Sequence, residues 1–137
     1  MARADDTGSV AVEAAIAAPA LFLLLMLVIF AGRVTEAKQQ VLSAADAAAR
    51  AASLVNDPLE AEAAGQAAAE DNLADGGITC TPTDVDVDTA NLHPNGSVTA
   101  TVSCTTDLSG VALPGVDPSQ TFTASSTEVV DRYRGGG

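Results

Sequence analysis

Residues 14–32 read AAIAAPALFLLLMLVIFAG, and most of the architecture follows from them. The stretch contains no charged or strongly polar residue, and its centre, residues 21–30, is apolar on every side of a helix. Its 19 residues form a helix about 28 Å long, close to the roughly 30 Å thickness of a bilayer core. The remainder of the chain has too little apolar bulk to enclose such a helix. The stretch therefore predicts a membrane-spanning segment.

The rest of the composition argues against several classes of protein. The chain has 137 residues and a mass of 13.6 kDa, enough for one small domain and an appendage. Its formal net charge of −12 is opposite to that of proteins that neutralise nucleic-acid phosphates. Aromatic residues make up 3% of the chain, and one His and two Cys leave little for a metal site or a nucleophile. We therefore expect no enzyme activity, cofactor, metal, small-molecule substrate or nucleic-acid partner.

The residues on either side of the apolar stretch bear on its orientation. The leader carries Arg3 against Asp5 and Asp6, unlike the basic region of a secretory signal peptide, and no small-residue cleavage site follows the stretch. We therefore expect a retained, single-pass anchor. Basic residues are nearly balanced across it, so the positive-inside rule does not orient the chain. The two Cys residues favour an oxidising compartment, which places the C-terminal part outside the cytoplasm.

Glu13 lies at the edge of the apolar stretch, where a carboxylate is costly unless it is paired or reaches the lipid headgroups. One interpretation is an acid near the start of a helix, favoured by the helix dipole. A second interpretation follows from its distance to Gly8. Cleavage after Gly8 makes Ser9 the first residue and Glu13 the fifth. A free amine and a carboxylate with this spacing can pair between neighbouring, staggered helices, where the low dielectric strengthens their attraction.

This N-terminal sequence, with Gly8, Glu13 and an apolar helix that contains Pro19, resembles the TadE/TadG-like family. Members of that family are pseudopilins, or minor pilins, of tight-adherence (Flp-type) type IV pilus systems. The resemblance implies that a prepilin peptidase removes residues 1–8 as a leader and that residues 9–33 form the membrane-spanning, pilin-like helix. It also implies a protein of the cytoplasmic membrane that enters an extracellular pilus, with other pilins and pilus assembly proteins as partners. Because major Flp pilins are little more than one helix, a chain of this length is expected to be a minor component.

A second hypothesis does without the leader peptidase. In it the chain is an unprocessed, membrane-anchored module that binds a surface or a protein outside the cytoplasm, as an adhesin does. Gly8 and Glu13 then have no special role. The two hypotheses differ in the N-terminal residue of the mature chain, which is Ser9 only in the first.

An Ala-rich helical stalk is predicted over residues 34–77. In its first part, apolar residues recur at spacings of three and four, the pattern of a helix with one packed face. Ala permits close approach of another helix or of a sheet, although each Ala buries little area. Polar residues, Ser53 among them, are expected on the opposite face. The packed seam comprises Val34, Ala37, Val41, Ala44, Ala48, Ala51 and Val55.

The stalk is interrupted at residues 56–58, Asn-Asp-Pro. Asp57 suits the N-cap of a new helix and Pro58 its first position, and Glu60 then stands where a capping box has its acid. The second helix is expected to run to about Ala74 and to end at the glycines that follow. The alternative is a kink within one continuous helix.

Residues 78–131 are predicted to form a small antiparallel β domain. A first strand alternates Val with Asp, so that its acids share a solvated face, and a turn signal at residues 92–96 leads to a second strand. The third strand is expected over residues 121–130. The side chains expected to face the core are Val85, Val87, Val98, Ala100, Val102, Cys104, Phe122 and Ala124.

Cys80 and Cys104 fall on neighbouring strands of this thin-cored sheet. Their even number, their placement and the expected oxidising compartment favour a disulfide over two free buried thiols. Residues 132–137 are expected to form a flexible tail. The whole sequence predicts an α+β chain: a long N-terminal transmembrane, pilin-like helix that continues into Ala-rich helices, then a small antiparallel β-sheet stapled by one disulfide.

Overall fold

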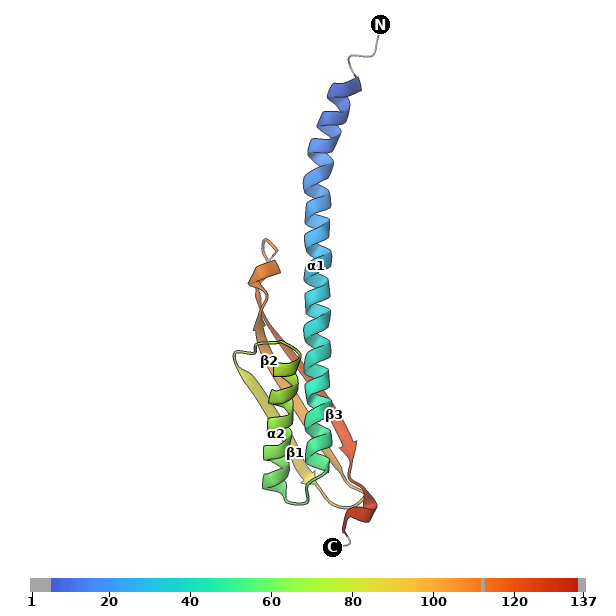
Figure 1. Cartoon of the computed structure of the whole chain (residues 1–137), viewed down its shortest axis with the longest axis vertical. Helices are drawn as coiled ribbons and strands as arrows, with labels where there is room; N and C mark the ends of the chain where they lie inside the picture. Colours follow the sequence, from blue (N-terminus) through green and yellow to red (C-terminus); the bar gives the residue numbers. More distant parts are fainter. Residues whose placement is uncertain (1–5, 112, 136–137) are drawn as a thin grey trace.

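The computed structural model describes residues 6–111 and 113–135. One long helix, α1 (Asp6–Ser53), protrudes with its first half from a folded domain and packs within that domain with its second half (Figure 1). The domain also contains α2 (Pro58–Asp75) and the strands β1 (Thr83–Asn91), β2 (Ser97–Asp107) and β3 (Ser119–Val129). Two short 3₁₀ helices follow β2 and β3, η1 (Ser109–Val111) and η2 (Arg132–Gly135). The predicted α+β architecture is confirmed.

The 48 residues of α1 include both the predicted membrane-spanning segment and the first helix of the stalk. Ala and Leu, which have high helix propensity, dominate its sequence. Pro19 lies inside the helix and removes one backbone hydrogen bond, but proline is commoner in membrane-spanning helices than in soluble ones. The apolar half and the packed half are thus joined by continuous helix rather than by a hinge loop.

A tight connection reverses the chain between α1 and α2. The carboxylate of Asp57 accepts hydrogen bonds from the backbone N–H groups of Leu59, at 2.9 Å, and Glu60, at 3.1 Å, so the predicted N-cap is confirmed. α2 ends at Gly76, and Gly77 takes a φ of +73° that favours glycine. The alternative of a kinked single helix is wrong, because α2 folds back along α1 (Figure 1).

The three strands form an antiparallel sheet in the order β1-β2-β3. β1 and β2 make the predicted hairpin, in which Val85 lies opposite Val102 and Val87 opposite Ala100. Its turn depends on Asn95, which has a φ of 64°, and on Gly96, where a Cβ would collide with the carbonyl oxygen of Asn91. The hairpin register therefore follows from both the alternating Val residues and the turn chemistry.

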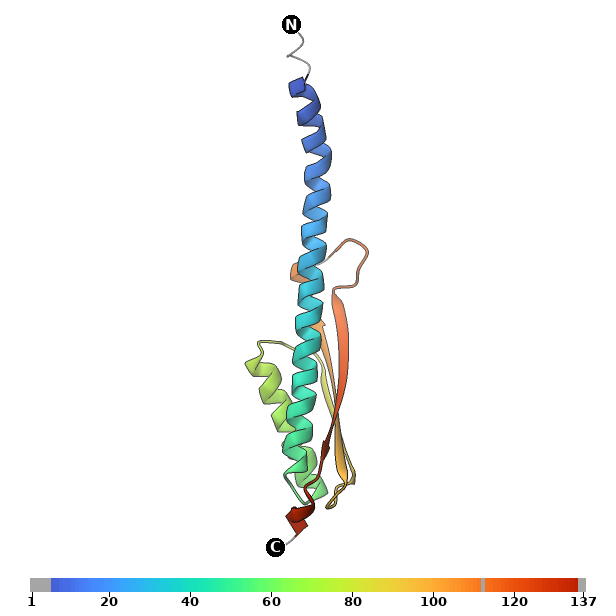
Figure 2. The same cartoon turned by 90° about the vertical axis from the view of Figure 1, so that its right-hand side faces the viewer.

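Both helices cover the same face of the sheet (Figure 2). α1 contacts β2 and β3, whereas α2 contacts β1 and α1. All of the side chains predicted to face inward from the strands are buried or half-buried. The buried core consists of Ala37, Val41, Ala44, Ala45, Ala48, Ala49, Ala52, Ala61, Ala69, Leu73, Val87, Val98, Ala100, Val102, Cys104, Phe122 and Val130.

The packed seam of α1 is wider than the sequence pattern predicts. Ala45, Ala49 and Ala52 are fully buried although they lie outside the predicted seam, and Ala51 is only half-buried. Ser53, expected on the exposed face, is also buried, and its hydroxyl donates to the carbonyl oxygen of Arg50. The reason is that α1 is enclosed from two directions, by α2 and by the sheet, so two adjoining faces are covered.

The predicted disulfide joins Cys80, in the segment before β1, to Cys104 of β2, with the two Cα atoms 5.1 Å apart. On the opposite, solvated face of the sheet, hydroxyl groups of β2 and β3 pair at 2.8–2.9 Å. The Asp residues of β1 are exposed, as predicted. The hydroxyl pairs are Thr99–Thr127, Thr101–Ser125, Ser103–Thr123 and Thr105–Thr121.

Candidate functional site: the exposed apolar helix

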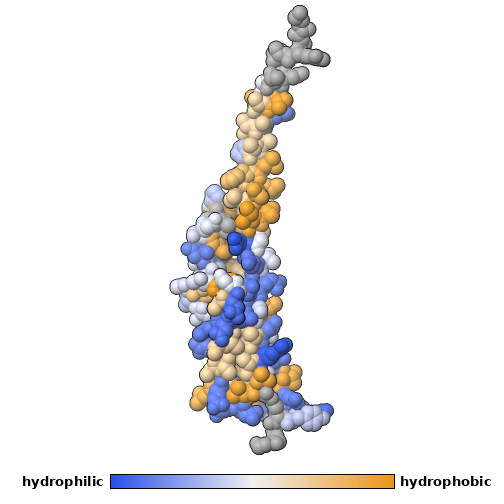
Figure 3. Space-filling view, in the orientation of Figure 1, coloured by the Kyte–Doolittle hydropathy of each residue, from blue (hydrophilic) through white to orange (hydrophobic). Residues whose placement is uncertain are grey.

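The most unusual surface of the molecule is the protruding, apolar half of α1, up to residue 33, where most of the large apolar side chains are exposed. Its most apolar 18-residue window has a mean hydropathy of 2.7, and none of that window is buried. Figure 3 shows apolar residues covering this part of the helix. Ten large side chains are each more than half exposed: Val10, Val12, Ile16, Leu21, Phe22, Leu23, Leu24, Leu25, Leu27 and Val28. By length and composition the helix is able to cross a membrane.

The exposure surrounds the helix rather than following one stripe. Five consecutive residues, Leu21 to Leu25, are between 54% and 64% exposed, and consecutive residues point in different directions around a helix. Burying one such side chain contributes about 1.5–3 kcal/mol, so an aqueous environment for this surface is strongly unfavourable. A helix that is apolar all round belongs in a bilayer or within a bundle of other helices.

The predicted cleavage junction lies at the start of this helix. Residues 1–5 of the predicted leader lie outside the described residues, whereas Gly8 and Ser9 are helical and exposed. A Cβ placed on Gly8 would meet nothing within 4 Å. The chain's own packing therefore gives no reason for a glycine at this position. Gly32, at the other end of the apolar stretch, is equally open.

Glu13 is exposed on α1, one turn beyond Ser9. Within the described part of the chain it forms no ion pair, since the ion pair there joins Arg33 to Glu36. Because the helix projects away from the domain, the structure does not bring Glu13 close to the disulfide or to the sheet (Figure 1). A partner for the Glu13 carboxylate must come from outside the described chain.

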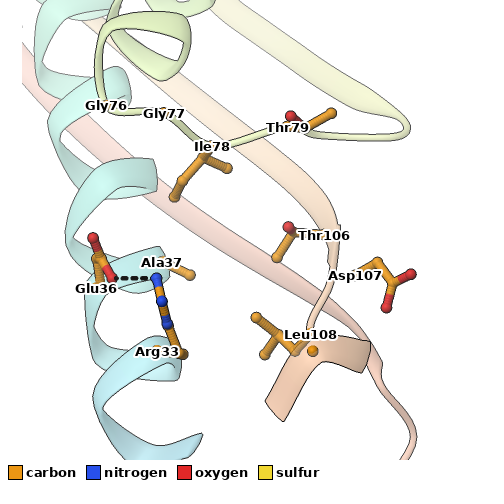
Figure 4. A pocket seen from close by; sticks show the side chains of 11 residues that line it. Arg33, Glu36, Ala37, Gly76, Gly77, Ile78, Thr79, Thr106, Asp107 and Leu108 are labelled. Atoms are coloured by element: carbon orange, nitrogen blue, oxygen red, sulfur yellow. Dashed lines mark ion pairs between the residues drawn. The ribbon is translucent and has the colours of Figure 1, made fainter. Parts of the chain in front are cut away.

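A hollow of about 380 Å³ lies where α1 enters the domain (Figure 4). Arg33 and Glu36 line it from α1, with 3.5 Å between Nη1 and Oε2, and both side chains are more than half exposed. An exposed pair of this kind contributes at most about 1 kcal/mol to stability. Ile78 and Leu108 supply apolar walls from other segments. Sequence reasoning missed this hollow because its walls come from segments far apart in the chain.

The remaining predicted site residues, Cys80 and Cys104, have a structural role. Cys80 and Cys104 staple the segment before β1 to the central strand, inside the domain. Among the described residues, no three His, Cys, Asp or Glu side chains are grouped so as to hold a metal ion. The features that remain available for function are therefore the apolar half of α1, its N-terminal junction and the surfaces next to them.

Comparison with known proteins gives one match. A family model described as TadE-like protein matches residues 8–50, which include the predicted junction, Glu13, the exposed apolar half of α1 and most of its packed half. No curated protein and no solved structure matches the chain. The family match supports a protein associated with tight-adherence pili. Over residues 8–50 the chain is thus TadE-like, as its N-terminal sequence predicts.

Proposed function

We propose that this chain is a minor pilin, or pseudopilin, of a tight-adherence (Flp) pilus. The observation that carries the proposal is the apolar half of α1, which protrudes from the domain with ten large apolar side chains more than half exposed. A pilin uses such a helix twice, first as a membrane anchor and then as one helix of the bundle at the centre of the filament. In both places the helix exchanges contact with water for an apolar surrounding.

Before assembly, the helix spans the cytoplasmic membrane and the domain lies on the extracytoplasmic side. The disulfide between Cys80 and Cys104 supports this orientation, because disulfides persist in oxidising compartments. The strongly acidic net charge and the polar outer face of the sheet suit a domain that remains solvated throughout. The chain has no catalytic role in this proposal and uses no cofactor.

Cleavage by a prepilin peptidase after Gly8 releases Ser9 as the new N-terminus. The exposed junction is accessible to an enzyme at the start of the helix. The open space around Gly8 gives this residue no packing role within the chain, which is compatible with recognition by an external partner such as the active site of a peptidase. The TadE-like match begins at this residue.

In the filament, the Glu13 carboxylate pairs with the Ser9 amine of a neighbouring subunit. Within one helix the two groups lie near the same end, and Glu13 finds no cationic partner in the described chain. Between staggered helices they meet in an apolar surrounding, where an unpaired charge is costly. The pair therefore fixes the axial stagger between subunits.

The cleavage is tested by the intact mass and N-terminal residue of the protein purified from its native host. Gly8→Ala is compared with Gly32→Ala, because both positions are open and neither substitution disturbs packing. We expect a mature chain beginning at Ser9 in the wild type and in Gly32→Ala, and an uncleaved chain in Gly8→Ala. A full-length chain in all three contradicts processing and favours the unprocessed, membrane-anchored binding module.

The role of Glu13 is tested separately by counting pili. Glu13→Gln removes the charge while preserving shape, and Glu36→Gln is a matched control on the same helix, exposed but beyond the apolar half. We expect fewer or shorter pili with Glu13→Gln only, while cleavage at Gly8 is retained. Unchanged pili in both variants contradict the pairing with the Ser9 amine.

A further inference from the structure

The loop between β2 and β3 begins beside Arg33 and Glu36 of α1 and extends from there toward the apolar half of the helix. Figures 1 and 2 both show it extending along α1 toward the N-terminal end, beyond the rest of the domain. Its first turn, η1, contacts α1. The loop therefore occupies the level at which the apolar helix leaves the domain.

The ends of this loop are firmly closed and its tip carries no charge. The backbone N–H of Leu108 donates to the carbonyl oxygen of Pro118 at 2.7 Å. The carboxylates of Asp107 and Asp117 each accept a backbone N–H two residues on, at 2.8 Å. Between these two acids the sequence has no charged residue. The charges are thus confined to the base of the loop, next to the sheet.

The face of α1 that adjoins the loop is partly covered, whereas its other faces are open. Met26, Ile29 and Phe30 are half-buried, while Leu27 and Val28 on other faces are more than half exposed. The half-buried residues continue the packed seam of the domain, through Val34, into the apolar half of the helix. η1 contacts α1 close to this level, since Gly110 of η1 lines the same hollow as Arg33, while other faces of the apolar helix remain open.

We propose that residues 113–116 of this loop, with the side chains of Leu113 and Val116, are a second membrane contact in the boundary between headgroups and hydrocarbon. The inference rests on the proposed function, because it requires that α1 spans the bilayer. If residues 14–32 occupy the hydrocarbon, a loop that begins beside Arg33 and extends toward the N-terminal end of α1 lies at the depth of that boundary. There its polar backbone still reaches water and headgroups, while its apolar side chains leave water.

The charged residues nearby fit this depth. Arg33 is the first charged residue after the apolar stretch, and its exposed guanidinium lies beside Glu36 at the mouth of the hollow under the loop. A long basic side chain at this level extends its charge to the headgroups while its stem stays in apolar surroundings. Val116 is 39% exposed and Leu113 is half-buried, so the tip has apolar surface left for lipid.

The test places an environment-sensitive fluorophore on single introduced cysteines of the full chain, in vesicles of phosphatidylethanolamine and phosphatidylglycerol. Val116→Cys reports the proposed membrane contact. Thr123→Cys, exposed on the outer face of β3, reports the solvated domain, and Leu27→Cys reports the anchor. We expect blue-shifted emission, quenching by brominated lipid and protection from aqueous iodide at positions 116 and 27, but not at 123.

Three results overturn the proposal and are distinguishable. Iodide quenching at position 116 equal to that at 123, with position 27 protected, shows an anchored chain whose loop stays in water. Quenching by iodide at all three positions shows that the anchor itself has failed, and with it the membrane stage of the proposed function. Protection at position 116 in assembled pili but not in vesicles assigns the loop to a neighbouring subunit and also overturns the lipid contact.

A second variant separates lipid contact from local packing. With the fluorophore on a Ser109→Cys background, at an exposed position, we expect Val116→Asp to increase iodide quenching, since a carboxylate draws the loop out of the boundary. Val129→Asp is the control, because Val129 is 71% exposed at the end of β3, at the opposite end of the domain. Equal quenching in the two variants contradicts the proposal.

Discussion

The two halves of α1 reverse the usual relation between side-chain size and burial. In the packed half, six of the seven buried apolar residues are Ala, and the seventh is Val41. In the protruding half, ten Val, Ile, Leu and Phe residues are more than half exposed. Large apolar side chains contribute most when buried, so the chain keeps its strongest apolar surface for partners outside its own fold.

The small residues have their own physical purpose. Ala lets α1 approach α2 and the sheet closely, and Gly65 of α2 packs closely too, since a Cβ there would lie 2.8 Å from a methyl carbon of Val87 in β1. On the α1 side, the domain's core thus depends on the close approach of small residues, whereas the sheet supplies bulkier core side chains such as Val98, Val102 and Phe122. Each half of α1 is suited to a different surrounding, and substitutions are expected to affect one half without the other.

The largest expected difference comes from placing the same charge in each half. Val41→Asp buries an unpaired carboxylate at a fully buried position and should lower the free energy of unfolding by more than about 4 kcal/mol. Leu24→Asp should leave the domain's urea midpoint unchanged but weaken retention in membranes, because a charge at the bilayer centre costs about 2.5–3.5 kcal/mol. Urea denaturation in mild detergent and carbonate extraction of membranes measure the two effects. Similar effects of both variants on the urea midpoint would contradict the separation of the two halves.

The disulfide should come next, and its effect should stay within the domain. Its cysteines are 24 residues apart, and closing a loop of this length contributes about 3.5 kcal/mol in the chain-entropy model. We expect the double variant Cys80→Ala, Cys104→Ala to lose a free energy of unfolding of this order while its membrane retention is unchanged. Reduction of the wild type, followed by thiol blocking, is the matched control. A loss of membrane retention in either sample would contradict the independence of the two halves of α1.

A pair of identical glycine substitutions sharpens the comparison further. At Gly65 the new methyl group would lie 2.8 Å from Val87 Cγ2 and 3.3 Å from the carbonyl oxygen of Ala48. Overpacking of this kind costs about 1–3 kcal/mol, partly offset by the higher helix propensity of Ala. Gly65→Ala should therefore lower the domain's free energy of unfolding by about 1–2 kcal/mol, whereas Gly32→Ala, with open space around it, should not. Equal midpoints in urea denaturation would show that α2 shifts away from β1 and α1 without cost.

The smallest effect is expected at the cap of α2. Asp57→Ala removes the acceptor for two backbone N–H groups and should cost about 1 kcal/mol. Asp57→Asn retains a capping side chain and should lie within a few tenths of a kcal/mol of the wild type. Urea denaturation distinguishes the two, and a full-size loss with Asn would mean that charge rather than hydrogen bonding stabilises the turn.

Local patterns predicted much of this molecule. The apolar stretch, the break at Asp57, the hairpin and the pairing of Cys80 with Cys104 follow from run length, capping chemistry, alternation and turn residues, all of which act over short distances. The burial of Ala45, Ala49 and Ser53 did not follow, because it depends on two elements closing on α1 at once. The placement of the β2–β3 loop beside the apolar helix also depends on tertiary packing. At the candidate site, the pattern identified Gly8 and Glu13, whereas their role remains a prediction.

The central claim is that the protruding half of α1 belongs to an interface outside the chain and not to the fold of the domain. The most direct measurement compares the full chain in detergent with residues 34–137 in plain buffer, both oxidised, by urea denaturation and amide hydrogen exchange. The account predicts that the shorter chain is soluble and monomeric, with a urea midpoint lowered only slightly, by the loss of the half-buried Met26, Ile29 and Phe30, and with faster exchange confined to the connection between β2 and β3. A shorter chain that precipitates, or that exchanges rapidly throughout β2, would contradict it.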